Sequence, residues 1–238
     1  MNQEIIKLDD VHTYYGLAQI LSGVSLCVTE GEAVGLLGRN GEGKTTTLKT
    51  IMCLIRPRKG QIFFKGENIV GLSHHLVARK GISLVPEGRH IFPALSVIEH
   101  LKVPVGPRRR DRGSLLEKVF KIFPELKGRE NQLAKALSGG QQQMLVIARS
   151  LMTVPSLLLL DEPMEGLAPV MVSRVIDALH SIREEGISIL FASTNFERAS
   201  LIATSAYIIQ RGRIVYYGRK DELGSAQHIL QRYLGVRV

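Results

Sequence analysis

Residues 38–46, with the sequence GRNGEGKTT, have the types and spacing that can hold phosphate groups. They fit the pattern G-x-x-x-x-G-K-[ST], with Gly38, Gly43, Lys44 and Thr45 in register. Glycines let the backbone curl so that its N–H groups point at phosphate oxygens, and a helix that starts here adds the positive end of its dipole. Lys44 suits the β- and γ-phosphates, and the Thr45 hydroxyl suits Mg²⁺. The segment therefore predicts a nucleotide-binding loop made of Gly38, Arg39, Asn40, Gly41, Glu42, Gly43, Lys44, Thr45 and Thr46.

Glu42 is the unusual member of this loop, because it adds a negative charge where negative phosphates are expected. Two like charges ~4 Å apart repel by about 1 kcal/mol in water and by more at a lower dielectric constant. We expect Glu42 to reduce nucleotide affinity modestly. The alternative is that its side chain points outward while the loop binds phosphate through its backbone.

Two adjacent acids, Asp161 and Glu162, follow four leucines in the segment LLLLDEP. Alternation along a strand sends neighbouring side chains in different directions, so the two acids can have different roles. Asp161 suits Mg²⁺, which keeps most of its waters and takes few carboxylates. Glu162 suits the polarisation of a water molecule for in-line attack on a γ-phosphate. This segment therefore predicts the catalytic centre.

A second helix start with the character of an anion site lies at residues 137–143, LSGGQQQ. Ser138 is a good N-cap, Gly139 and Gly140 leave backbone N–H groups bare, and a helix follows from Gln141. One chain with one nucleotide loop has no obvious need for a second such site. We therefore expect these four residues to serve the nucleotide of another subunit.

The elements that must position these motifs follow from hydrophobic patterning. Continuous apolar runs alternate with segments of helical periodicity, which predicts an α/β fold with a mostly parallel sheet buried on both faces. Residues 89–154 break this rhythm, and we expect an inserted helical sub-domain there within a single domain over 1–238. The expected strands lie in 32–38, 60–66, 81–88, 156–163 and 186–193 and near the end of the chain, and the expected helices in 44–54, 141–152 and 170–184.

Composition restricts the classes of partner. The chain has 238 residues and a net charge of +9, which suits acidic small ligands, anionic lipid headgroups or nucleic acid. The basic segment 106–113, GPRRRDRG, has no aromatic residues, so we interpret it as a solvated loop near a membrane face and expect no nucleic acid. No apolar run has bilayer-spanning length, and the first residues lack the order of a secretion signal. Cys27 and Cys53 are too few for a disulfide framework, which favours a reducing cytosol.

Together, GRNGEGKTT, LLLLDEP and LSGGQQQ resemble the ATP-binding subunit of ATP-binding-cassette (ABC) transporters over essentially the whole chain. The resemblance implies a P-loop NTPase fold with a mostly parallel core sheet, an N-terminal antiparallel β region and an inserted helical sub-domain. It implies ATP and Mg²⁺ as ligands, and a second ABC ATPase subunit paired head to tail, so that each signature covers the other's ATP. It also implies transmembrane permease subunits, indirectly a solute-binding protein, and a location on the inner face of the cell membrane.

Local motifs narrow the resemblance. Residues 84–97, 161–169 and 233–235 look like the smaller ATPase subunit of branched-chain amino-acid importers, and related amide and urea importers share much of the pattern. By this resemblance, Tyr15 stacks on adenine, with Tyr14 as the adjacent alternative. Glu87 takes the position, commonly Gln, that senses Mg²⁺ and the membrane subunit, and the groove for that subunit lies near residues 87–101.

Two positions depart from the family pattern. Met164 stands where this branch usually has a serine, and Thr194 stands where the family generally has a His that contacts the γ-phosphate. Thr194 can donate or accept a hydrogen bond but carries no charge, so we expect retained ATP binding with slow hydrolysis. The alternative for this strand end is that Ser193 or Asn195 caps the next helix. Two other classes, a cassette acting on ribosomes or DNA and a phosphate-loop kinase, are less consistent with the motifs.

Overall fold

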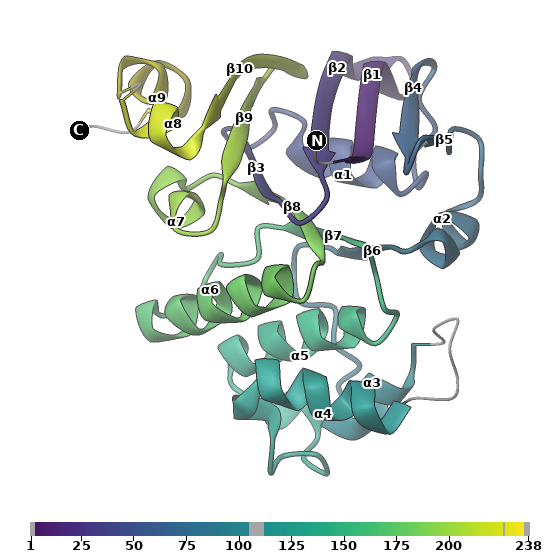
Figure 1. The fold of residues 1–238 in the computed structure, drawn as a ribbon, viewed down its shortest axis with the longest axis vertical. Helices are drawn as coiled ribbons and strands as arrows, with labels where there is room; N and C mark the ends of the chain where they lie inside the picture. Colours follow the sequence, from purple (N-terminus) through teal and green to yellow (C-terminus); the bar gives the residue numbers. More distant parts are fainter. Residues whose placement is uncertain (1–2, 105–111, 226, 236–238) are drawn as a thin grey trace.

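The computed structural model describes residues 3–104, 112–225 and 227–235, which form two sheets (Figure 1). An antiparallel sheet has the order β2-β1-β4-β5, and a larger sheet has the order β10-β9-β3-β8-β7-β6. In the larger sheet the strands from β9 to β6 are parallel and β10 is antiparallel to β9. The strands are β1 (Glu4–Tyr15), β2 (Ala18–Thr29), β3 (Ala33–Leu37), β4 (Lys59–Phe64), β5 (Glu67–Asn68), β6 (Ile82–Val85), β7 (Leu157–Asp161), β8 (Ser188–Ser193), β9 (Ser205–Gln210) and β10 (Arg213–Arg219).

The described part of residues 89–154 contains three helices, two short 3-10 helices and one isolated β-bridge, but no strand. In Figure 1 these helices gather at the end of the molecule away from the antiparallel sheet, and α5 and α6 both pack against the larger sheet. The architecture confirms the expected fold class. The helices are α1 (Lys44–Ile51), α2 (His74–Lys80), α3 (Val97–Lys102), α4 (Arg112–Ile122), α5 (Gly139–Leu151), α6 (Pro169–Glu184), α7 (Phe196–Ser200), α8 (Lys220–Ser225) and α9 (Gln227–Leu234), with 3-10 helices η2 (Pro124–Leu126) and η3 (Ala134–Ala136).

The four leucines of β7 explain why the large sheet is buried on both faces. Leu157 and Leu159 belong to a core shared with α1 and the antiparallel sheet, whereas Leu158 and Leu160 belong to a core shared with α5 and α6. All four have no exposed surface. Burying one leucine side chain stabilises a fold by roughly 1.5–3 kcal/mol, so this strand anchors both layers. Asp161 ends this strand and Glu162 follows it directly, so a rigid element holds both acids.

Local backbone chemistry decides where the helices begin and end. The helix expected over 44–54 ends at Ile51, because Cys53 has a φ of 53° and cannot continue a right-handed helix. The helix expected from Gln141 begins at Gly139, because the Ser138 side chain caps it.

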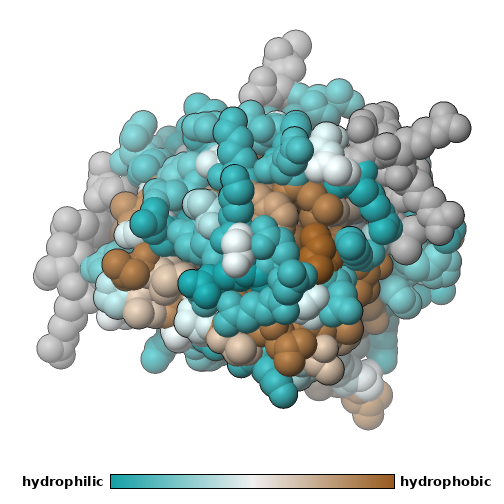
Figure 2. Space-filling model, turned by 90° about the horizontal axis from the view of Figure 1, so that it is seen from below, coloured by the Kyte–Doolittle hydropathy of each residue, from teal (hydrophilic) through white to brown (hydrophobic). Residues whose placement is uncertain are grey.

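The end with α3, α4 and α5 is mostly hydrophilic at its surface, with hydrophobic residues gathered in separate patches (Figure 2). Among the residues with a described structure, no helix is both long enough and apolar enough to cross a bilayer.

Val154 is a strained residue between α5 and β7. Its φ is 54°, in the left-handed region, and its side chain is 50% exposed. A β-branched side chain crowds the following carbonyl there, which costs about 1–2 kcal/mol relative to the right-handed region. An exposed apolar side chain gains little from burial to offset this. Val154 therefore destabilises the fold locally.

We predict that Val154→Asn raises the free energy of unfolding by about 1 kcal/mol, since Asn adopts the left-handed region readily. Urea unfolding followed by circular dichroism measures the change. Val170→Asn is the matched control, because Val170 is exposed but lies in the first turn of α6, outside the left-handed region. A loss of stability in Val154→Asn would show that backbone strain does not control stability at this position.

His100 is buried in α3 and bonds to backbone through both ring nitrogens. The Phe92 N–H donates to Nε2 at 2.9 Å, and Nδ1 lies 2.9 Å from the Ser96 carbonyl oxygen, so the neutral ring carries its hydrogen on Nδ1. The Arg149 guanidinium lies over the Phe92 ring at 5.1 Å and donates to the His90 carbonyl at 3.1 Å. Burial lowers the pKa of His100, and Arg149 lowers it further, while hydrogen bonding to Ser96 opposes them. His100 thus fixes the loop at residues 90–92 only while it is neutral.

A lowered folded-state pKa means that the His100 contribution is complete above pH about 6.5, the unfolded pKa. It is lost as the pH falls through the folded-state pKa. We predict that between pH 7.5 and 5.5 the unfolding free energy of the native protein falls more steeply than that of His100→Gln, whose amide does not titrate. His74→Gln, at an exposed position, should keep the native slope. Equal slopes in all three proteins would contradict the assignment.

Candidate nucleotide and catalytic site

The predicted phosphate loop connects buried strand β3 to α1, and two of its glycines are sterically required. Gly43 caps α1 with a φ of 109°, and a Cβ atom there would lie 2.9 Å from the Leu21 side chain. A Cβ atom on Gly38 would lie 2.6 Å from the Ile209 carbonyl oxygen. Larger residues would therefore push the loop away from β9 and β2.

Lys44 links the loop to the acid cluster. Its side chain is buried, and Nζ donates to the carbonyl oxygens of Gly38 at 2.9 Å and Arg39 at 3.3 Å. The same Nζ lies 3.2 Å from Glu162 Oε1, and both side chains are less than a tenth exposed. A shielded cation at the start of a helix is suited to pairing with anionic phosphate oxygens.

Glu162 stands where the chain leaves β7, with a left-handed φ of 47°. Its N–H donates to the Ala192 carbonyl at 3.1 Å, and its Oε2 accepts the Thr194 N–H at 3.2 Å. Burial raises the pKa of Glu162, and the positive charge of Lys44 partly offsets this. A carboxylate with a raised pKa binds a proton more readily, so Glu162 is suited to act as a general base.

Asp161 is buried at the end of β7, and its Oδ1 has no hydrogen-bond partner among the described residues. Burial raises its pKa, and the charge of Glu87 adds to this, whereas hydrogen bonding to Thr45 and the charges of Lys44 and Lys49 lower it. An unpartnered buried carboxylate oxygen beside a threonine hydroxyl is the kind of oxygen ligand that Mg²⁺ takes. The residues present therefore fit a magnesium ion.

Lys44, Thr45 and Glu162 line a cavity of about 360 Å³, whereas Asp161 is not in its lining. Tyr15 lines it, whereas the ring of Tyr14 lies against the Arg58 guanidinium at 4.3 Å, so the structure favours Tyr15 over its neighbour. Ile20 and Glu165 line it as well and were not predicted; neither belongs to a phosphate-binding pattern. Gly38, Arg39 and Glu42 are not in the lining. The predicted residues that line the cavity are Tyr15, Asn40, Gly41, Gly43, Lys44, Thr45, Thr46, Glu87 and Glu162.

Glu42 does not line this cavity, which agrees with the alternative in which its side chain points outward from the phosphate loop. Its side-chain Oε2 accepts the Arg211 N–H, and its main-chain carbonyl accepts the Gly212 N–H at 3.0 Å. Gly212 has room only for hydrogen, since a Cβ atom would lie 1.9 Å from the Ile20 carbonyl oxygen. Glu42 therefore fastens the phosphate loop to the turn between β9 and β10.

Thr194 follows β8 and contacts the acid cluster through its backbone N–H, not through its side chain. Any residue other than proline can supply that bond. Asn195 is the N-cap of α7, since its Oδ1 accepts the Arg198 N–H at 2.8 Å. The capping alternative is therefore correct for Asn195, and the Thr194 side chain is not among the groups that line the cavity.

The signature residues lie outside that cavity. Ser138 and Gln141 form a capping box: the Gln141 N–H donates to Ser138 Oγ at 3.3 Å, and the Ser138 N–H donates to Gln141 Oε1 at 3.0 Å. A Cβ atom on Gly139 would lie 2.6 Å from the Arg89 guanidinium, and one on Gly140 would lie 2.4 Å from the Met171 side chain. Packing against Met171 therefore requires glycine at position 140, whereas the flexible end of Arg89 can move to admit a side chain at position 139. The next turn of the helix contributes Gln143, which was not predicted, to a smaller cavity that also contacts Glu87, Glu162 and Glu165.

The chain is similar to known proteins over most of its length. A family model described as ABC transporter matches residues 21–165. The high-affinity branched-chain amino acid transport ATP-binding protein BraG of Pseudomonas aeruginosa is 40% identical over 232 residues, which cover 97% of this chain and 100% of that protein. The lipopolysaccharide export system ATP-binding protein LptB of Haemophilus influenzae is 33% identical over 235 residues, which cover 97% of both.

Two solved structures share the fold. A nucleotide-free ATP-binding cassette from an ABC transporter has a TM-score of 0.85 at 23% identity, covering 99% of this chain and 100% of that one. A dimeric ATP-binding cassette bound to ADP and phosphate has a TM-score of 0.79 at 23% identity, covering 90% of this chain and 98% of that one. With the phosphate loop, the buried acids and the capped signature helix assembled in one cassette, the chain belongs to the ABC transporter family as an ATP-binding subunit that hydrolyses ATP.

Proposed function

We propose that this ATPase energises an importer of branched-chain amino acids. The observation that carries the proposal is the 40% identity to BraG over the whole length of that protein. The same ATP-binding fold serves transporters of different molecules, so the fold alone says little about the transported molecule. In this proposal the chain acts on the inner face of the cell membrane with transmembrane permease subunits, and indirectly with a solute-binding protein.

We assign the site residues accordingly. Tyr15 stacks on adenine and the loop from Gly38 to Thr46 holds the phosphates. The groups suited to Mg²⁺ are Thr45, Asp161 and Glu87. Residues 1–238 act as one ABC domain, in which the helical segment 89–154 faces the permease. When bound, Mg²⁺ would neutralise charge on the phosphates as the leaving group departs.

Glu162 and Lys44 carry the reaction in this scheme. Glu162 takes the proton from the attacking water, and its raised pKa favours that transfer. Lys44 pairs with Glu162 Oε1 at 3.2 Å and can also pair with phosphate, so phosphate competes with the carboxylate for the same ammonium. A carboxylate released from that pair is free to accept a proton. Thr194 stays our candidate for the position beside the γ-phosphate, with a slow turnover expected from its short, uncharged side chain.

A second subunit completes the proposed site. The N-terminus of α5 lies outside the nucleotide cavity of its own chain, and the signature residues there are Ser138, Gly139, Gly140 and Gln141. Such a helix start binds anions, and the dimeric cassette with the same fold provides a precedent for pairing. We propose that these residues close over the partner's ATP, in a homodimer or a heterodimer.

Lipopolysaccharide export is the second candidate, because LptB is 33% identical over 97% of its length. Amide and urea import, which the sequence motifs also allow, is the third. The three differ in the molecule moved and not in the ATPase chemistry.

We predict that proteoliposomes containing this chain and its permeases take up leucine when ATP is present inside and the binding protein outside. Glu162→Gln should reduce ATP hydrolysis and uptake by at least about 100-fold while ATP still binds, since general-base catalysis contributes roughly 10²–10⁴-fold. Glu184→Gln, an exposed acid at the end of α6, should behave as the native protein.

The outcomes separate the candidates. Release of lipopolysaccharide, or uptake of urea or an amide without leucine, would replace the proposed cargo but leave the ATPase assignment intact. Full hydrolysis by Glu162→Gln would contradict the assignment of the base.

Glu42 provides a test of the phosphate loop. Gln can still accept the Arg211 N–H, whereas Ala cannot, so Glu42→Gln should keep the native affinity for ATP and Glu42→Ala should weaken it several-fold. Titration with a fluorescent ATP analogue at low salt measures both. Tighter binding in both variants would instead show that charge repulsion from Glu42 outweighs its role in fastening the loop.

A further inference from the structure

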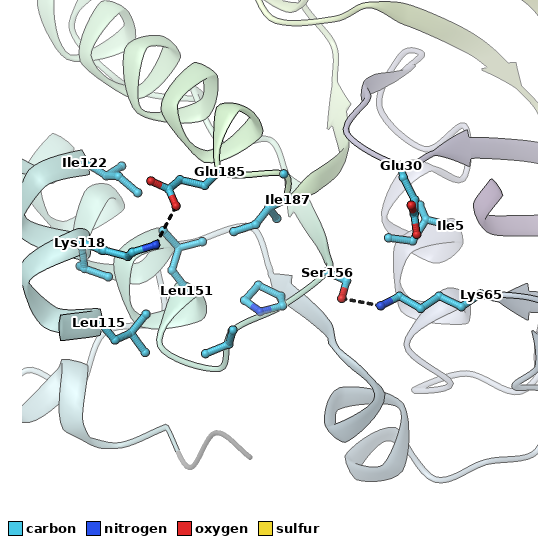
Figure 3. A pocket seen from close by; sticks show the side chains of 14 residues that line it. Ile5, Glu30, Lys65, Leu115, Lys118, Ile122, Leu151, Ser156, Glu185 and Ile187 are labelled. Carbon is cyan, nitrogen blue, oxygen red and sulfur yellow. Dashed lines mark hydrogen bonds and ion pairs between the residues drawn. The ribbon is translucent and has the colours of Figure 1, made fainter. Parts of the chain in front are cut away.

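A second hollow lies at the opposite end of the parallel strands from the acid cluster. It has a volume of about 400 Å³, and residues just before β3, β7 and β8 contribute to it, together with one face of α4 (Figure 3). It shares no residue with the cavity that Lys44 lines. The lining consists of Ile5, Glu30, Lys65, Leu115, Lys118, Val119, Ile122, Leu151, Val154, Pro155, Ser156, Glu185, Gly186 and Ile187.

One end of this hollow is aliphatic. Leu115 and Ile122 project from α4, and Leu151, at the end of α5, and Ile187, just before β8, face them (Figure 3). Leu115, Ile122 and Ile187 are only partly buried and pack at the edge of the core. Val154, the strained left-handed residue, is on the same rim. Strained residues often gather at ligand sites, so the position of Val154 directs attention to what this hollow could bind.

A cation and a carboxylate stand beside this aliphatic end. Lys118 Nζ lies 3.0 Å from Glu185 Oε2, and their side chains are 62% and 45% exposed. An exposed ion pair contributes little to stability, so a ligand that carries both charges can replace it at little cost. At the other end Lys65 Nζ donates to Ser156 Oγ at 2.8 Å, beside Glu30.

We propose that this hollow binds an aliphatic α-amino acid. Its carboxylate pairs with Lys118, its ammonium pairs with Glu185, and its branched side chain lies among Leu115, Ile122 and Leu151. A fatty acid would leave Glu185 without a new partner, and a phosphate ester would meet the carboxylates of Glu30 and Glu185. An aliphatic zwitterion matches the apolar and the charged parts of the lining together.

The binding site rests on this lining alone. Its use as a feedback site, where accumulated cargo binds the ATPase, rests in addition on the proposed import of branched-chain amino acids. A ligand here contacts α4 and the segment after α6 at once, and so ties the helical segment to the large sheet.

Isothermal titration of the full-length chain with leucine tests the proposal. We expect saturable binding that weakens at least tenfold with 4-methylpentanoate, which lacks the ammonium, and with 3-methylbutylamine, which lacks the carboxylate, since a charged hydrogen bond contributes about 1.5–3 kcal/mol. Lys118→Met and Leu115→Asp should each weaken leucine binding by the same order. Lys121→Met, on an exposed position of α4 outside the hollow, should not.

Binding of ATP with native affinity by each variant shows that it is folded, because the ATP site is separate. The absence of saturable leucine binding, or leucine binding that Lys118→Met and Leu115→Asp leave unchanged, would overturn the proposal. Binding of 4-methylpentanoate as tight as that of leucine would overturn the proposal of a zwitterionic ligand and indicate a simple aliphatic carboxylate. None of these results bears on leucine uptake by the assembled transporter, so the two proposals can fail independently.

Discussion

The ion pair between Lys44 and Glu162 depends on almost every layer of the fold. Both side chains are less than a tenth exposed, and removing two charges from water is favourable only if the protein compensates them. The carbonyl oxygens of Gly38 and Arg39 and the Thr194 N–H supply that compensation. The two charges approach because β7 and β3 both pair with β8 and end at the same edge of the sheet. A shift in this pairing would separate the loop from the acids.

This arrangement also explains how a stable protein keeps a reactive site. Glu162 has a left-handed backbone, and Asp161 has a buried oxygen without a hydrogen bond from any residue that the structure describes; both features are unfavourable in isolation. They are tolerated because four fully buried leucines precede them and hold the strand between two cores. The stability of β7 therefore offsets the strain at its end, where the chemistry is expected.

The two ends of the large sheet have different characters. At the carboxyl ends of the strands, backbone N–H groups, Lys44 and the start of α1 favour anionic ligands, as is general for open α/β sheets. At the amino ends, aliphatic side chains of α4 and the loop before β7 surround a hollow with a Lys118–Glu185 pair. Because α4 belongs to the helical segment and β7 to the core, a shift of one relative to the other would change the shape of this hollow.

The sequence by itself determined the phosphate loop, the acids after β7, the capped signature helix and the parallel sheet, because each is encoded by neighbouring residues whose spacing has a local physical meaning. It left open whether Tyr14 or Tyr15 faces the site and whether Glu42 points outward. Those answers depend on segments far apart in the chain. The Arg58 guanidinium lies over the Tyr14 ring, and the Arg211 N–H donates a hydrogen bond to the Glu42 carboxylate. The hollow beside α4 has no sequence motif, since its lining comes from β1, α4, the end of α5 and the segments after β4 and before β3, β7 and β8. Only tertiary structure decides such features, because only packing brings these side chains together.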